Sequence, residues 1–137
     1  MAAKFPDQMG GRQMNRTAIS RAAFLQGINE RPKEDVPLPE LGEGLVVVVV
    51  GMTAKERTAF ERQFATKDGK TIDARMNEFR ERLVVACCRN DDGSLLFQPE
   101  DVTTLGGKRA DVLERIVNAC QRLSGFSKED IEATVGN

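Results

Sequence analysis

One leucine followed by five valines, residues 45–50, restricts the fold of this 137-residue chain more than any other segment. Valine is β-branched and favours strands, and Gly51 ends the run, so the segment predicts a β-strand. Side chains alternate between the two faces of a strand, and neither face is polar here. One face carries Leu45, Val47 and Val49, and the other carries Val46, Val48 and Val50. Either the strand is central and fully buried, or another chain covers one face or edge.

A second extended segment precedes the valine run. Residues 36–41 place apolar side chains at every second position, but Pro37 and Pro39 remove backbone donors. This segment is therefore restricted to an edge strand or an extended arm. A Gly-Glu-Gly turn at residues 42–44 separates it from the valines, and a charged linker at residues 29–34 precedes it. We expect the two segments to pair as an antiparallel β-hairpin.

Helical signals follow the hairpin. Thr53 and Glu56 have the spacing of a capping box, in which each side chain bonds the other residue's backbone N–H. Phe60 and Phe64 lie four positions apart and therefore share a face of that helix. Later apolar residues recur at spacings of four, three, four and three, which is typical of a helix that packs on another helix. They are Ile72, Met76, Phe79, Leu83 and Ala86.

Four further segments predict short helices. The first covers residues 17–27, the second begins at Pro99 and ends at a Gly-Gly pair, and the last begins at Ser127. The longest covers residues 110–123, with Leu113, Ile116, Val117, Cys120 and Leu123 on one stripe. Residues 95–97 allow a very short strand.

Strands that are followed by helices, and do not alternate with them, indicate an α+β fold. We expect an N-terminal β-hairpin packed on about four to five mostly short α-helices. Residues 1–16 show no periodic apolar pattern and predict a flexible N-terminal tail. Residues 17–137 are expected to form a single domain.

The composition excludes several classes of function. The chain has no His, Trp or Tyr, and its 3 Cys, one short of a four-thiolate zinc site, are expected to be reduced. Without imidazole, Ser-His-Asp and Cys-His catalysis are excluded within one subunit. Its 20 Lys and Arg balance 21 Asp and Glu, which leaves no basic field for nucleic acid. Its longest apolar run is far shorter than the ~20 residues that span a bilayer, so we expect no membrane partner. From the missing residue types and the balanced charge, we also expect no cofactor and no nucleic-acid partner.

Three motifs suggest a site, and each has a simpler interpretation. Residues 90–94 are acidic, but the Glu of a calcium loop would be displaced by one position, so we favour a turn. Residues 106–109 lack the earlier glycine of a phosphate-binding loop and favour a hinge between helices. Cys87 and Cys88 lack the Cys-x-x-Cys spacing of redox sites. We expect small buried residues, one facing the core and the other its margin.

The order of several motifs goes further. The most specific are Thr-Ala-x-Glu-Arg at residues 53–57, Asp-Gly-x-x-Leu-Phe at residues 92–97 and Glu-Asp-Val at residues 100–102. Around them lie Ala-Phe-Leu at 23–25, the segments 36–42 and 46–50, Phe-Glu at 60–61, Ala-Arg at 74–75, residues 83–87, Leu105 and Leu-Ser-Gly at 123–125. Over residues 17–126, this series resembles the tail assembly chaperones of long-tailed bacteriophages.

That resemblance implies a non-enzymatic protein of the host cell cytoplasm that is absent from the finished particle. Such chaperones coat the tape measure protein, keep it soluble and recruit tail tube subunits. Many occur in two forms, and this chain would correspond to the short one. The family brings no catalytic residue that could be carried over to this sequence.

A protein that holds apolar helices needs an apolar surface rimmed by charge. The candidate contact residues are Val46, Val48, Val50, Phe60 and Phe64. Such a chain is expected to form a homo-oligomer until its client arrives. The alternative is a structural virion protein, such as a tail terminator or connector subunit, and a third interpretation is a small enzyme that uses carboxylates or a thiol.

Overall fold

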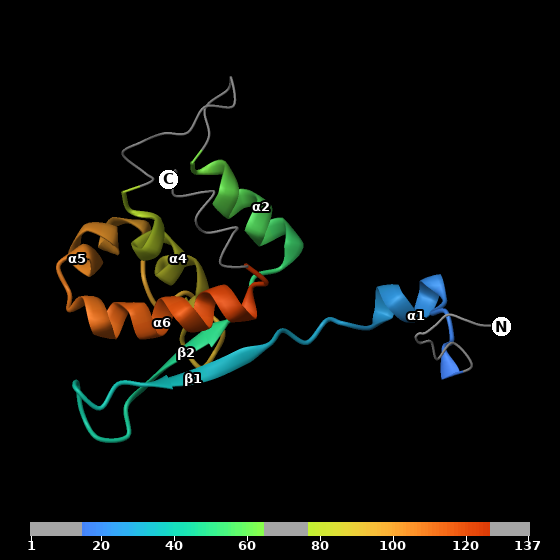
Figure 1. The fold of residues 1–137 in the computed structure, drawn as a ribbon, viewed down its shortest axis with the longest axis horizontal. Helices are drawn as coiled ribbons and strands as arrows, with labels where there is room; N and C mark the ends of the chain where they lie inside the picture. The colour runs from blue at the N-terminus through green and yellow to red at the C-terminus, as the bar shows by residue number, and fades with distance from the viewer. Residues whose placement is uncertain (1–14, 65–76, 127–137) are drawn as a thin grey trace, which may run out of the picture. The chain divides into compact units, whose positions relative to one another are not determined.

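The computed structural model describes residues 15–64 and 77–126 (Figure 1). The expected tail up to residue 14, the helix from Ser127, and two members of the apolar seam, Ile72 and Met76, lie outside the described residues. The chain divides into two compact units, residues 1–30 and 31–137. The first contains helix α1 (Arg21–Gln26), none of whose residues is buried. Ser20 caps α1, its hydroxyl accepting from the Ala23 N–H at 3.1 Å.

The second unit contains a three-stranded antiparallel sheet in the order β1-β2-β3. Its strands are β1 (Lys33–Pro37), β2 (Val46–Val50) and β3 (Cys88–Arg89). The predicted hairpin of β1 and β2 is confirmed, with Lys33 opposite Val50 and Pro37 opposite Val46. Strand β2 is therefore the central strand of the sheet. A central position was part of one of the two alternatives that the valine run left open, the other being coverage by another chain.

The position of the first strand was predicted wrongly. Lys33 and Glu34 belong to β1 and not to a linker, because they pair with the last two valines of β2. The strand ends at Pro37, and the N–H of Leu41 donates to the carbonyl of Leu38 at 3.0 Å in the turn that follows. Residues 95–97 form no strand either, since only Leu95 makes an isolated bridge, to Arg89.

The helices agree closely with their sequence signals. Helix α2 (Ala54–Arg62) begins with the predicted capping box, in which both reciprocal bonds measure 3.1 Å. Helix α4 (Phe79–Cys87) buries Phe79 and Leu83 of the predicted seam. The 3-10 turn η2 (Pro99–Asp101) leads into α5 (Val102–Gly106), which Gly107 caps. Helix α6 (Ala110–Leu123) has the predicted bounds.

The hydrophobic core lies between the sheet and the helices. Helix α6 packs on one face of the β1–β2 hairpin and also against α4 (Figure 1). The aromatic ring of Phe60 lies edge-on to those of Phe64, Phe79 and Phe126, with centroid distances of 5.2, 5.5 and 6.0 Å. The α+β class is confirmed, with a hairpin and, in the part of the chain that the structure describes, five α-helices.

Candidate protein-interaction face

The valine strand has one buried face and one accessible face. Val49 is fully buried, and Val47 packs against the core cluster beside it. Of the other three valines, Val46 is 46% exposed, while Val48 and Val50 are half-buried, as Val47 also is. The structure therefore gives β2 a central position without burying both of its faces. We call the accessible side, with Val46, Val48 and Val50 along its centre, the outer face.

A depression runs along the outer face. One hollow of about 500 Å³ is open to solvent and contains Val48 and Val50 in its lining. A second, of about 190 Å³, contains Val46, and Leu96 lies on its border. The two hollows adjoin each other, since both are lined by Val48, Arg89, Asn90 and Asp91.

Charged side chains border this apolar centre on both sides. Lys33 and Asp35 share the outer face because they lie opposite Val50 and Val48, and side chains of directly opposed residues point the same way. Arg89 lies opposite Val48 from β3, and Asp91 follows in the next turn. An apolar centre with a charged border is the arrangement of a protein contact surface.

The edge of the sheet is less suited to binding than its face. Strand β1 is an edge strand, and Pro37 removes one donor from it. The Pro37 carbonyl accepts a hydrogen bond from Arg115 Nη1 at 3.0 Å. Proline and charge on a short edge strand hinder the addition of another strand. The β1 edge is therefore poorly suited to the addition of a partner strand.

The two predicted phenylalanines lie apart from the valines. Phe60 is 2% exposed and Phe64 is 4% exposed, and both belong to the aromatic cluster of the core. In this fold they are not available to a partner, so we leave them out of the proposed surface. Helix α2 ends at Arg62, so Phe64 follows the helix and does not share a helical face with Phe60, although their spacing predicts one. A helical spacing also does not distinguish a core face from a binding face.

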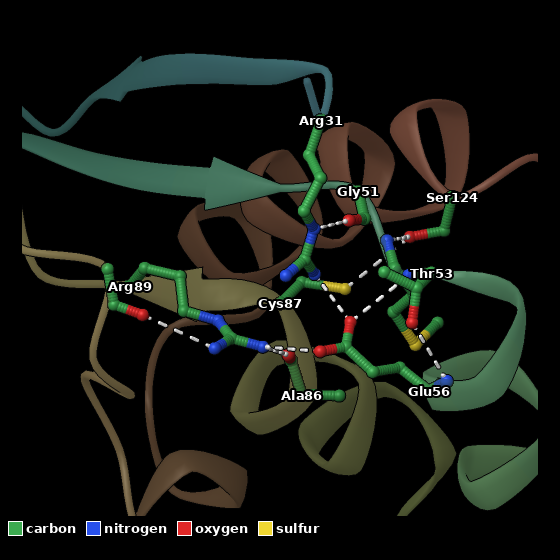
Figure 2. A network of polar contacts seen from close by, with 10 residues as sticks. Arg31, Gly51, Thr53, Glu56, Ala86, Cys87, Arg89 and Ser124 are labelled. Atoms are coloured by element: carbon green, nitrogen blue, oxygen red, sulfur yellow. Dashed lines mark hydrogen bonds and ion pairs between the residues drawn. The ribbon is translucent and has the colours of Figure 1, made fainter. Parts of the chain in front are cut away.

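An ionic cluster supports one end of the sheet (Figure 2). Glu56 Oε1 accepts from Arg31, and Oε2 lies 3.7 Å from Arg89 Nη2. Arg31 also donates from Nε to the Gly51 carbonyl at 3.0 Å, while the Gly51 N–H donates to the Pro32 carbonyl at 2.8 Å. Because Pro32 has no N–H to return that bond, the guanidinium of Arg31 supplies the missing donor. The cluster thus holds Arg89 at the border of the outer face.

The second group of polar contacts in Figure 2 lies at the end of α6. Ser124 Oγ accepts from the Met52 N–H at 3.1 Å and lies 3.6 Å from Cys87 Sγ. Cys87 and Cys88 are both fully buried, so the expectation that one would face the margin is wrong. The helix ends between them and Cys88 turns into β3, so a helical rotation does not separate their side chains.

The cysteines form a buried group of free thiols. Hydrogen bonds with the thiols of Cys87 and Cys88, together with burial, raise the pKa of Cys120 above its usual value. A raised pKa keeps a thiol protonated and unreactive at neutral pH. The hydrogen bond with Cys120, together with that to Ser124, lowers the pKa of Cys87. That thiol is fully buried, however, so no reactant can reach it in this arrangement.

The acidic segment at residues 90–94 is a turn. The predicted turn at residues 90–94 is confirmed by a bond from Asn90 N to Ser94 O at 2.8 Å, with Gly93 at a φ of 90°. Asp92 accepts from the backbone and hydroxyl of Ser94, which lowers its pKa. Within residues 15–64 and 77–126, no three His, Cys, Asp or Glu side chains converge as metal ligands.

The sequence patterns did not indicate the charged border of the outer face. Lys33 and Asp35 alternate with Glu34, and that polar period could have revealed one side of the face. Arg89 and Asp91 carried no such signal, because a strand of two residues is too short to show a period. None of the helices in the described part of the chain has the length and apolar character needed to cross a membrane.

One solved structure that this fold matches is that of the tail assembly chaperone of bacteriophage HK97. The match has a TM-score of 0.51 and covers 80% of this chain and all of that one, at 13% sequence identity. No family model and no curated protein matches the sequence. The predicted resemblance to tail assembly chaperones is thus confirmed as a likeness of fold.

Proposed function

We propose that this chain is a non-enzymatic phage tail assembly chaperone that binds the tape measure protein through the outer face. The observation that carries the proposal is an accessible row of valines on a fold that matches a tail assembly chaperone. In this role the chain acts in the host cell cytoplasm, keeps the tape measure protein soluble, recruits tail tube subunits and is absent from the mature virion.

The chemistry of the outer face supports an apolar helical client. Val46, Val48 and Val50 offer a row of short, stiff side chains against which the apolar stripe of a helix packs. The hollows along that row provide a concave seat. Lys33 and Asp35 on one side, with Asp91 on the other, offer charges for the polar flanks of the helix.

Co-expression with the tape measure protein of the same phage tests the proposal. We expect wild-type chain to keep that protein in the soluble fraction and to co-purify with it. Val48→Lys should abolish both effects, because it places an unpaired charge in the apolar centre of the contact. Asn118→Lys adds the same charge at an exposed position of α6 and should behave as wild type.

Equal circular dichroism and thermal unfolding of the two variants would show that Val48→Lys acts on binding. If Val48→Lys holds the tape measure protein as well as wild type does, the outer face is not the client site. Mass spectrometry of purified particles separates the chaperone from the alternative of a tail terminator or connector subunit. A chaperone is absent from the particle, whereas a connector is present.

A further inference from the structure

The two ends of the valine row carry exposed charges of opposite sign. Lys33 lies opposite Val50 at one end of the row, and both residues line the larger hollow. Strand β3 runs antiparallel to β2, so the chain after Arg89 advances toward Val46, and Asp91 lines the hollow there. The outer face therefore has a cationic end beside Val50 and an anionic end beside Val46.

The other charges beside the hollows have partners within the chain. Glu34 forms an ion pair with Arg122, and Glu56 lies 3.7 Å from Arg89, whose side chain is only 15% exposed. The exposed charged residues of this face that form no ion pair within residues 15–64 and 77–126 are Lys33, Asp35 and Asp91. Asp35 lies opposite the middle of the row. One cation at one end and two anions over the remainder are thus available to a client.

We propose that the outer face accepts a client helix in one direction only, with its acidic flank over Lys33 and its basic flank over Asp35 and Asp91. The inference rests on the proposed function, because it defines the segment that the same face binds. The row from Val46 to Val50 spans about 13 Å, which is the length of about nine helical residues. The client segment is therefore an apolar stripe of two to three turns, with acidic residues at one end and basic residues at the other.

The valines themselves do not select a direction. Val46, Val48 and Val50 are identical side chains at a regular spacing, so an apolar stripe makes much the same contacts with them in either direction. Reversal of the helix would place its basic flank over Lys33 and its acidic flank over Asp91. Like charges opposed across an interface disfavour binding, so the charged ends of the face supply the directional preference.

Binding of model peptides to the purified full chain tests the charge rule. All peptides share one apolar helical stripe, and their two flanks are Lys then Glu, Glu then Lys, or Glu at both ends. In fluorescence anisotropy we expect the two mixed peptides to have similar Kd values. The peptide with Glu at both ends should bind about fivefold more weakly, because one of its flanks meets carboxylates.

A charge reversal in the chain tests the same rule from the other side. Lys33→Glu should weaken both mixed peptides about fivefold, because their acidic flank then meets a carboxylate. Lys55→Glu makes the same change at an exposed position of α2, outside the lining of both hollows, and should leave these Kd values unchanged. Matched thermal unfolding of the two variants would show that folding is intact.

A spin label on one end of each peptide reports the direction of binding by NMR. A label at the acidic end should broaden the backbone amide signals around Lys33 and spare those around Asp91, for both mixed peptides. Lys33→Glu combined with Asp91→Lys should reverse this pattern. Equal broadening at the two ends, broadening that follows the N-terminus of the peptide whatever its charge, or no binding of any peptide would overturn the inference.

The chaperone function is measured separately, by the solubility of the co-expressed tape measure protein. A chain that keeps that protein soluble but shows no charge preference for the peptides retains the proposed function and loses this inference. A chain that binds the mixed peptides in the expected direction but leaves the tape measure protein insoluble retains the charge rule and loses the proposed function.

Discussion

Arg115 on α6 donates two hydrogen bonds to the carboxylate of Glu40 in the loop after β1. Nη2 donates to Oε2 at 2.7 Å and Nη1 donates to Oε1 at 3.0 Å. The bond from Arg115 is the main reason that the pKa of Glu40 falls from 4.5 to about 2. The pair thereby connects the hairpin loop to the helix that covers the buried face of the sheet.

We expect Arg115→Ala to raise the pKa of Glu40 toward 4.5 in an NMR titration of its carboxyl group. The folded pKa lies below the unfolded one, so the pair contributes fully above the unfolded pKa and is lost as pH falls toward 2. Wild type should accordingly lose more stability across that window than Arg115→Ala does. Arg80→Ala, which removes a surface pair with Glu114, should leave the pKa of Glu40 unchanged.

Gly51 is required where the sheet meets the end of α6. A Cβ at this position would overlap the Leu123 carbonyl oxygen and lie 2.9 Å from Pro32 Cγ. Gly51→Ala should therefore lower the free energy of unfolding in urea by about 1–3 kcal/mol. Gly107→Ala is the control, because its Cβ would approach nothing closer than 3.5 Å. That variant should be neutral or more stable by up to about 1 kcal/mol, and equal losses would contradict the crowding argument.

Phe60 and Val46 should contribute very differently to the stability of the fold. Phe60 sits at the centre of the aromatic cluster, so Phe60→Ala should cost about 3–5 kcal/mol of unfolding free energy. Val46→Ala removes less than that, about 1 kcal/mol at most, because Val46 is 46% exposed. Chemical denaturation measures both values. A large loss for Val46→Ala would place that valine in the core and weaken the case for the outer face.

Local signals predicted most of the elements. The reciprocal bonds of Thr53 and Glu56, and helix α6 with its bounds at Ala110 and Leu123, follow from residues within one or two turns of one another. Strand β2 follows from β-branching alone. Strand β1 was misplaced because its bounds depend on pairing with the last two valines, and no residue of β1 carries that information.

The candidate site was predicted in part, for a related reason. Alternation of side chains identified Val46, Val48 and Val50 as one face. It did not show which of the two faces α6 would cover, since both are apolar. The position of Arg89 on the border of the outer face depends on the two-residue strand β3. It also depends on the ion pairs that Glu56 forms with Arg89 and with Arg31. Such long-range contacts leave no periodic trace in a sequence.

The three thiols provide a test of the non-enzymatic interpretation. Cys87, Cys88 and Cys120 are buried and free, and a raised pKa keeps the thiol of Cys120 protonated at neutral pH. We expect the native protein to react with a maleimide only as fast as it unfolds, and to show three reactive thiols at once in denaturant. Asn118→Cys adds an exposed thiol on α6 and should label rapidly, as a positive control. Rapid labelling of a native cysteine in wild type would reveal an accessible thiolate and revive the enzymatic alternative.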